Sequence, residues 1–182
     1  MTGWIKAIVP GLMTAALFAG MPAAVAADAP ENRIAHSIVI DAPTDKVWEV
    51  VGDFVGLDRW FPSIESSTLK LGKNRQVGCI RELRRLSGTK VEEKLIAFDP
   101  WNMSMTYTYA GGQPLTSDYF ATMTVKDAGN GKSLVEWNAR FKRLYYWTDN
   151  PPAGQDDASL TNLLNKVYAS SLENLKKLLE SE

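Results

Sequence analysis

The sequence predicts one α+β domain, in which a curved antiparallel sheet of about seven strands surrounds a long C-terminal helix. Three observations predict it. Apolar residues keep a three-to-four-residue spacing for about five turns near the C-terminus. Six segments with alternating polarity, separated by turn-like residues, precede that helix. One further strand and two short helical segments come before those six. No repeat or linker divides residues 27–182, so we expect a single domain.

The first 26 residues are typical of a secretory signal peptide. Lys6 is the only charged residue before Asp28, residues 7–18 are apolar, and Ala24-Val25-Ala26 forms an A-x-A cleavage site. The alternative is an uncleaved anchor, but the strongly apolar part is only about 12 residues, against the ~20 that a spanning helix needs. We therefore expect cleavage after Ala26, a mature domain at 27–182, a periplasmic location, and no stable membrane insertion after cleavage.

The remaining elements follow in order along the chain. Residues 33–40 alternate with isoleucines on one face, which predicts a strand. Pro43 then begins a helix with a stripe at Val47, Trp48 and Val51, and residues 52–62 form a short bent helical piece. Turn-like residues separate extended segments at 65–71, 78–86, 91–98, 103–110, 118–126 and 133–142, which indicates a meander of hairpins.

The C-terminal helix is the clearest element. Asp156 and Asp157 stand where a helix N-terminus favours negative charge, and lysines lie near the far end. A helix of about 24 residues is ~36 Å long and needs a partner of similar length. Only the antiparallel sheet can supply one. Curved sheets and long helices rarely fit flush, so we expect a cavity between them that can bind a ligand.

Composition excludes several classes of function. Lys plus Arg is 20 and Asp plus Glu is 21, which gives no overall field to attract nucleic acid. The single cysteine, Cys79, excludes an internal disulfide and a Cys-based zinc site, and we expect it to be buried. The single histidine, His36, excludes multi-His metal sites, and we expect it on the polar side of its strand. We predict no cofactor and no bound metal.

Several motifs resemble the START-like (SRPBCC) superfamily, which includes polyketide cyclase/dehydrase and lipid-transfer-like proteins. Residues 38–43 with Val47-Trp48 are similar to its usual opening, and residues 53–62 to its "DF–L–W-P" stretch, although Phe61 stands where the family often has His. Residues 78–83, 93–95 and Asp99 resemble its paired-strand signature. Within the superfamily, residues 114–119, 141–143 and 154–177 are most similar to the MxaD-like periplasmic proteins associated with methanol oxidation. The resemblance implies the helix-grip (Bet v 1/START-like) fold.

The resemblance also implies which strand faces line the cavity. Alternation puts Arg81, Leu83 and Arg85 on one face of their strand, and Glu93, Leu95 and Ala97 on one face of the next. Charged groups in a cavity are costly unless they are paired, so Glu93 is expected to pair with Arg81 or Arg85. The pair could anchor a polar ligand group, do acid–base work, or be purely structural.

Other candidates come from the neighbouring strands, the helix and the loops. Tyr107, Tyr109 and Tyr119 suit a pocket that fixes an apolar ligand at one polar point, although ordinary sheet packing is the alternative. The helix is expected to contribute Leu164, Val167 and Ser171. Two hairpin loops at one end of the sheet are candidate gates, through Ser87, Gly88, Gly112, Pro114 and Leu115, or else plain turns. We expect the aromatic cluster 145–147 to be buried against the sheet rim; exposed, it would suggest a partner or membrane contact.

These observations favour a non-enzymatic periplasmic protein that binds a small hydrophobic or amphipathic molecule, or serves as an accessory factor to a periplasmic oxidation system. A periplasmic dehydrogenase or cytochrome would then be a protein partner. A second hypothesis is a cyclase or dehydratase that uses Glu93 or a cavity tyrosine as its acid–base group. A third is an interaction module whose cavity is filled by its own side chains. No nucleic-acid partner is expected.

Overall fold

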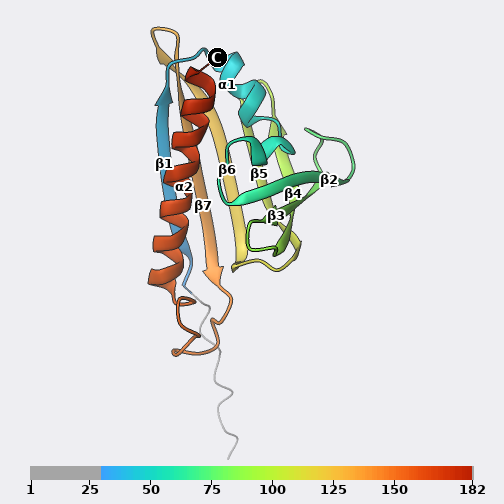
Figure 1. Cartoon of the computed structure of the whole chain (residues 1–182), viewed down its shortest axis with the longest axis vertical. Helices are drawn as coiled ribbons and strands as arrows, with labels where there is room; N and C mark the ends of the chain where they lie inside the picture. Colours follow the sequence, from blue (N-terminus) through green and yellow to red (C-terminus); the bar gives the residue numbers. More distant parts are fainter. Residues whose placement is uncertain (1–29, 182) are drawn as a thin grey trace, which may run out of the picture.

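The computed structural model describes residues 30–181 and contains one antiparallel sheet of seven strands with a long helix against it (Figure 1). The signal-peptide prediction concerns residues outside this range and stays a prediction. The strand order is β1-β7-β6-β5-β4-β3-β2, so the first strand joins the last one. The strands are β1 (Asn32–Ile40), β2 (Ile64–Leu71), β3 (Ile80–Arg85), β4 (Lys90–Asp99), β5 (Ser104–Gly112), β6 (Thr116–Gly129) and β7 (Lys132–Arg143). The predicted fold class is confirmed.

The C-terminal helix α2 (Asp157–Glu180) lies along β1 and β7 (Figure 1). It begins where the charge pattern predicts, because the Asp156 side chain accepts a hydrogen bond from the Ser159 amide at 2.8 Å. Its buried face consists of Leu160, Leu164, Tyr168, Ser171, Leu172, Leu175 and Leu179. Within residues 30–181, no helix has the length and apolar character to cross a membrane.

Two short helices connect β1 to β2. The first packs against β6 and β7, and the second packs against β2. Helix α1 (Thr44–Val51) follows Pro43 and buries Val47, Val50 and Val51, as its stripe predicts. The 3₁₀ helix η1 (Gly56–Arg59) and the residues around it bury Phe54, Leu57 and Trp60. The bent helical segment between 52 and 62 is thus confirmed, and its Phe54 and Trp60 rings contact Tyr107 and Trp137 of the sheet at 5.9 and 5.6 Å between centroids.

Two expectations about side-chain direction are wrong. His36 faces α2 rather than the polar side of β1, because it shares its strand face with Ile34 and Ile38; its Nε2 lies 2.8 Å from Oδ1 of Asn165. Ala97 does not continue the face of Glu93 and Leu95, because the β4–β5 register shifts between Leu95 and Ala97. The shift exposes Ala97, and Phe98 instead turns inward to stack on Trp48 at 5.5 Å between ring centroids.

Candidate functional site

The concave face of the sheet and helix α2 enclose a cavity of about 190 Å³. Residues from β2 to β7, from the η1 region and from one face of α2 form its walls. The lining side chains are Leu57, Phe61, Ser63, Ile64, Leu83, Arg85, Val91, Glu93, Tyr107, Tyr109, Leu115, Tyr119, Trp137, Leu163, Leu164, Val167 and Tyr168. The walls are mainly apolar and aromatic with few polar groups, which is the usual make-up of a small-molecule site.

Stacked aromatic rings form one wall of this cavity. Tyr109 and Tyr119 stack with their ring centroids 4.4 Å apart, and Trp137 stacks on Tyr168 at 3.8 Å. The Nε1 of Trp137 donates to the hydroxyl of Tyr107 at 3.0 Å, and the hydroxyls of Tyr119 and Tyr168 bond to each other. The hydroxyls of Tyr107, Tyr119 and Tyr168 are therefore bonded within the protein, and that of Tyr109 interacts with the Thr116 side chain, which leaves the rings as the main surface for a ligand.

Burial also determines the ionisation of these tyrosines. Desolvation is the largest cause that raises the pKa of Tyr107, Tyr109, Tyr119 and Tyr168, and the nearby Glu93 carboxylate adds to it. A phenol whose pKa is raised stays protonated at neutral pH and cannot act there as a general base. The acid–base role expected of a cavity tyrosine in the enzyme hypothesis is therefore limited to that of a proton or hydrogen-bond donor.

A buried ion pair closes the inner end of the cavity. The Nε and Nη2 of Arg81 donate to the Oε2 of Glu93 at 2.9 and 2.6 Å, and Nη1 donates to the carbonyl of Phe54. The guanidinium also lies over the rings of Phe54 and Tyr107, 4.1 and 4.9 Å from their centroids. Arg81 is only 1% exposed and does not line the cavity, whereas Glu93 does. The predicted pairing of Glu93 with Arg81 is present, and Arg85 is not its partner.

Arg85 and the two hairpin loops form the mouth of the cavity. The Nη1 of Arg85 donates to the carbonyl of Gln113 at 3.0 Å, so the β3–β4 and β5–β6 loops are joined at one end of the sheet, as predicted. Gly112 has a φ of +81°, and a Cβ there would come within 2.5 Å of the Lys90 carbonyl. Leu115 lines the cavity, whereas Ser87, Gly88, Gly112 and Pro114 do not. Their role as gates stays a prediction.

The other predicted site residues divide between the cavity wall and the layer behind it. The wall includes Leu83, Tyr107, Tyr109, Tyr119, Leu164 and Val167. Leu95 is buried away from the cavity, and Ser171 points its hydroxyl at the Val167 carbonyl, 2.7 Å away. These placements concern geometry, and contact with a ligand stays a prediction for every one of them.

Some lining residues were absent from the sequence prediction, chiefly Phe61, Trp137 and Tyr168. Trp137 alternates in phase with Val135 on β7, and Tyr168 follows Leu164 by four residues on α2, so periodicity places both on the inner faces. The sequence does not indicate which of the inward-facing residues line the cavity and which pack against one another. Periodicity gives the face of a residue but not the fit between the faces.

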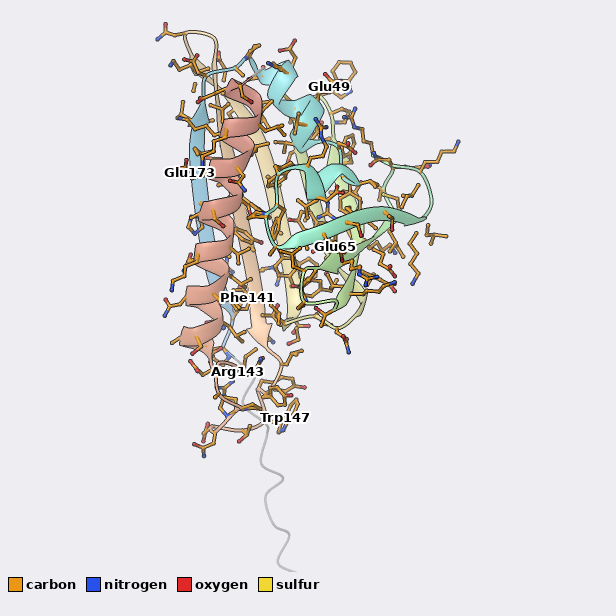
Figure 2. All side chains as sticks on the ribbon, viewed as in Figure 1. Glu49, Glu65, Phe141, Arg143, Trp147 and Glu173 are labelled. Carbon is orange, nitrogen blue, oxygen red and sulfur yellow. The ribbon has the colours of Figure 1, made fainter. Side chains whose placement is uncertain are left out.

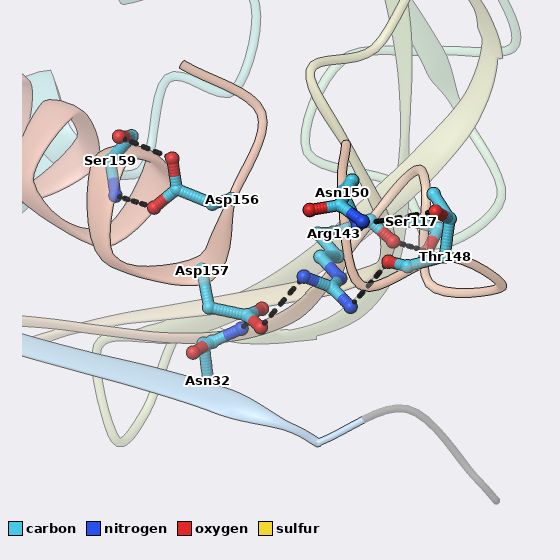
Figure 3. A network of polar contacts seen from close by, with 8 residues as sticks. All are labelled: Asn32, Ser117, Arg143, Thr148, Asn150, Asp156, Asp157 and Ser159. Atoms are coloured by element: carbon cyan, nitrogen blue, oxygen red, sulfur yellow. Dashed lines mark hydrogen bonds and ion pairs between the residues drawn. The ribbon is translucent and has the colours of Figure 1, made fainter. Parts of the chain in front are cut away.

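The aromatic loop after β7 differs from its expected position. Tyr146 and Trp147 are 50% and 69% exposed, and Trp147 lies at the end of the molecule beyond the start of α2 (Figure 2). The ring of Trp147 contacts those of Tyr145 and Tyr146, and of the three only Tyr145 is half-buried. Arg143 fixes the base of this loop, donating to the Thr148 carbonyl at 2.9 Å and lying 3.6 Å from Asp157 (Figure 3). Arg143 therefore holds this loop through its backbone, while the rings of Tyr146 and Trp147 are exposed.

The structure offers no assembled metal site within residues 30–181, because no group of three or more His, Cys, Asp or Glu side chains comes together there. Cys79 is buried, as expected, and burial raises the pKa of its thiol. A raised pKa keeps the thiol protonated and poorly nucleophilic. Cys79 does not line the cavity and adds no chemistry to it.

A curved sheet, a long helix across it and an aromatic cavity between them define a helix-grip domain. Residues 32–180 match the family described as "Polyketide cyclase / dehydrase and lipid transport". The chain belongs to this family, which confirms the superfamily-level resemblance.

Known proteins show how widely this fold is shared. The chain is 28% identical to an uncharacterized protein from Bacillus thuringiensis, with a TM-score of 0.68 over 81% of this chain and 98% of that one. It is 26% identical to XoxI from Bacillus cereus, with a TM-score of 0.69 over 81% and 94%. The Zhui aromatase/cyclase from Streptomyces sp. R1128, 16% identical with a TM-score of 0.70 over 83% and 94%, shares the fold.

A plant receptor is also similar in sequence. The chain is 23% identical over 145 residues to the "Abscisic acid receptor PYL6" of Arabidopsis thaliana. The match includes 78% of this chain and 66% of the receptor, so the chain spans just under two thirds of that relative.

Proposed function

We propose that this protein binds a small hydrophobic or amphipathic molecule in the helix-grip cavity without transforming it, after export through the N-terminal segment. The observation that supports this most directly is the aromatic cavity of about 190 Å³, whose polar groups are mostly bonded to other protein groups. The membership of a family that includes lipid-transport proteins agrees with a binding role. The similarity to MxaD-like proteins favours work beside a periplasmic dehydrogenase or cytochrome.

A cavity-blocking variant tests the binding function. Val167 lies on α2 at the cavity wall and is half-buried, so Val167→Trp fills space without replacing a core residue. Lys166→Trp adds the same ring to the exposed side of the same helix and is the matched control. We expect native mass spectrometry of protein purified from its own periplasm to show a co-purifying small molecule in wild type and Lys166→Trp but not in Val167→Trp. Equal occupancy in all three, or an empty wild type, contradicts the proposal.

Export is tested on the same material. Cleavage after Ala26 gives a mature N-terminus at Ala27, which the intact mass reports directly. Retention of residue 1, or fractionation with the inner membrane, contradicts the export proposal. A dehydrogenase or cytochrome that co-purifies under native conditions supports the accessory role.

Glu93 keeps an enzymatic alternative open for test. It is a carboxylate in the cavity wall, and both hydrogen bonds from Arg81 end on its Oε2. If the protein were a cyclase or dehydratase, Glu93→Gln would abolish turnover of a substrate and leave its binding nearly unchanged. Under the binding proposal the substitution changes affinity, and there is no turnover to lose.

A further inference from the structure

Cavity size and the distribution of its free polar atoms together restrict the class of ligand. An apolar cavity of about 150 Å³ holds one benzene molecule, whereas pockets for drug-sized ligands measure about 300–1,000 Å³. The cavity here, at about 190 Å³, corresponds to one ring or a short chain. A multi-ring polyketide or a two-chain lipid does not fit within it.

The inner end of the cavity offers an acceptor and no free cation. Each of the three guanidinium nitrogens of Arg81 donates to Glu93 or to the Phe54 carbonyl, and Arg81 does not line the cavity. Glu93 does line it, and within residues 30–181 no hydrogen bond reaches its Oε1. A carboxylate oxygen can only accept a hydrogen bond. The deepest polar group available to a ligand is therefore an acceptor with negative charge.

The aromatic rings favour the same kind of ligand. The rings of Tyr109, Tyr119 and Trp137 are part of the wall, and the electron-rich face of an aromatic ring attracts positive or hydrogen-bearing groups. Among residues 30–181, Arg85 is the only cation that lines the cavity; it stands at the mouth and already donates to Gln113. The carboxylate of a ligand could therefore pair with Arg85 at the mouth, but it would meet no cation at the inner end.

We infer that the cavity takes a single-ring or short-chain amphiphile that enters with a hydrogen-bond donor first, a hydroxyl or an amine that binds Oε1 of Glu93, and that it rejects ligands whose buried end is a carboxylate. This inference rests on the proposed binding function and specifies its ligand class. Its chemistry differs from that of a site for an organic acid, in which an unpaired lysine or arginine would face the ligand.

Four probes of similar size separate the possibilities: toluene, phenol, benzylamine and benzoate, titrated into the mature protein by ligand-detected NMR. We expect phenol or benzylamine to bind about tenfold more tightly than toluene, as a hydrogen bond to a charged acceptor provides, and benzoate to bind more weakly than toluene. In Glu93→Gln, which presents a neutral amide, the gain over toluene should fall to about threefold or less and the rejection of benzoate should disappear. Glu92→Gln, on the same strand but outside the cavity lining and paired with Lys70, is the matched control and should keep the wild-type order.

The outcomes distinguish this inference from the binding proposal itself. Benzoate binding as tightly as phenol, or phenol and benzylamine binding no better than toluene, overturns the donor-first inference while the cavity still binds. If no probe binds wild type, toluene included, the cavity is not a binding site and both proposals fall. Should Glu93→Gln not fold, the wild-type order of the four probes decides the matter alone.

Discussion

The Arg81–Glu93 pair provides the sharpest test of how the inner end of the cavity is built. Glu93→Ala leaves the Nε and Nη2 of Arg81 without an acceptor, in a guanidinium that is 1% exposed. Removing one partner of a buried ion pair costs about 3–5 kcal/mol in the free energy of unfolding. The carbonyl of Phe54 and the rings of Phe54 and Tyr107 still hold the guanidinium, so we expect the lower end, about 3 kcal/mol.

The expected loss is large enough for a thermal melt. At about 2–4 °C per kcal/mol for a chain of this size, Glu93→Ala should melt about 6–12 °C below wild type. The matched control is Glu92→Ala on the same strand, whose partner Lys70 is half exposed; such a pair contributes about 1 kcal/mol or less. The double variant with Arg81→Ala removes both charges and should lose less stability than the two single variants added together.

Two results would refute this reasoning. If Glu93→Ala has the same melting temperature as Glu92→Ala, the buried pair does not contribute to stability. If the losses of Glu93→Ala and Arg81→Ala simply add in the double variant, the two groups do not interact, and the inner end of the cavity is not organised as the distances indicate.

The remaining predictions concern the helix, a loop and alkaline pH. Leu172→Asp on the buried face of α2 should prevent folding, whereas Leu163→Asp, 43% exposed, should change the melting temperature little. Gly112→Ala should cost more in urea unfolding than Gly88→Ala, because both have positive φ but only Gly112 faces backbone within 2.5 Å. Burial raises the pKa of Tyr119 above its ordinary 10.0, so the stability it contributes is complete below pH 10 and lost as pH rises further; unchanged urea midpoints well above pH 10 would contradict this.

Periodicity alone could predict most of the fold, because the signals for it are local. The six-strand meander and the start of α2 at Asp157 follow from alternation, turn residues and capping, all of which act over a few residues. One error occurs where a single residue changes the phase, whereas His36 follows the regular alternation with Ile34 and Ile38. At Ala97 a bulge reverses the alternation, and nothing in that stretch of sequence marks it. Trp147 is exposed in a loop whose base is held by the hydrogen bond from Arg143 to the Thr148 carbonyl, a contact that the alternation of polarity does not encode.

The candidate site could be predicted only in part, for a different physical reason. Glu93 and Arg81 were foreseeable as a pair, since buried charges need partners. The sequence could not predict that Glu93 lines the cavity while Arg81 stays behind it. That arrangement depends on which oxygen of Glu93 accepts the hydrogen bonds and on the bond from Nη1 of Arg81 to the Phe54 carbonyl. The cavity itself depends on the distance between α2 and the sheet. The stacked pair of Trp137 and Tyr168 spans that distance, and a sequence gives no direct measure of it.

The volume of the cavity is large enough to affect the free energy of unfolding. At ~24 cal/mol per Å³, a fully enclosed and unfilled cavity of about 190 Å³ would lower stability by ~4–5 kcal/mol relative to a filled core, which is an upper value for a cavity that has a mouth. Collapse of α2 onto the sheet would remove that cost, but it would displace Tyr168 on α2 and break the bond between its hydroxyl and that of Tyr119. A ligand removes the first cost without incurring the second. A probe at a hundred times its dissociation constant should therefore stabilise the protein by about 2.7 kcal/mol, and the Val167→Trp variant should show no such gain.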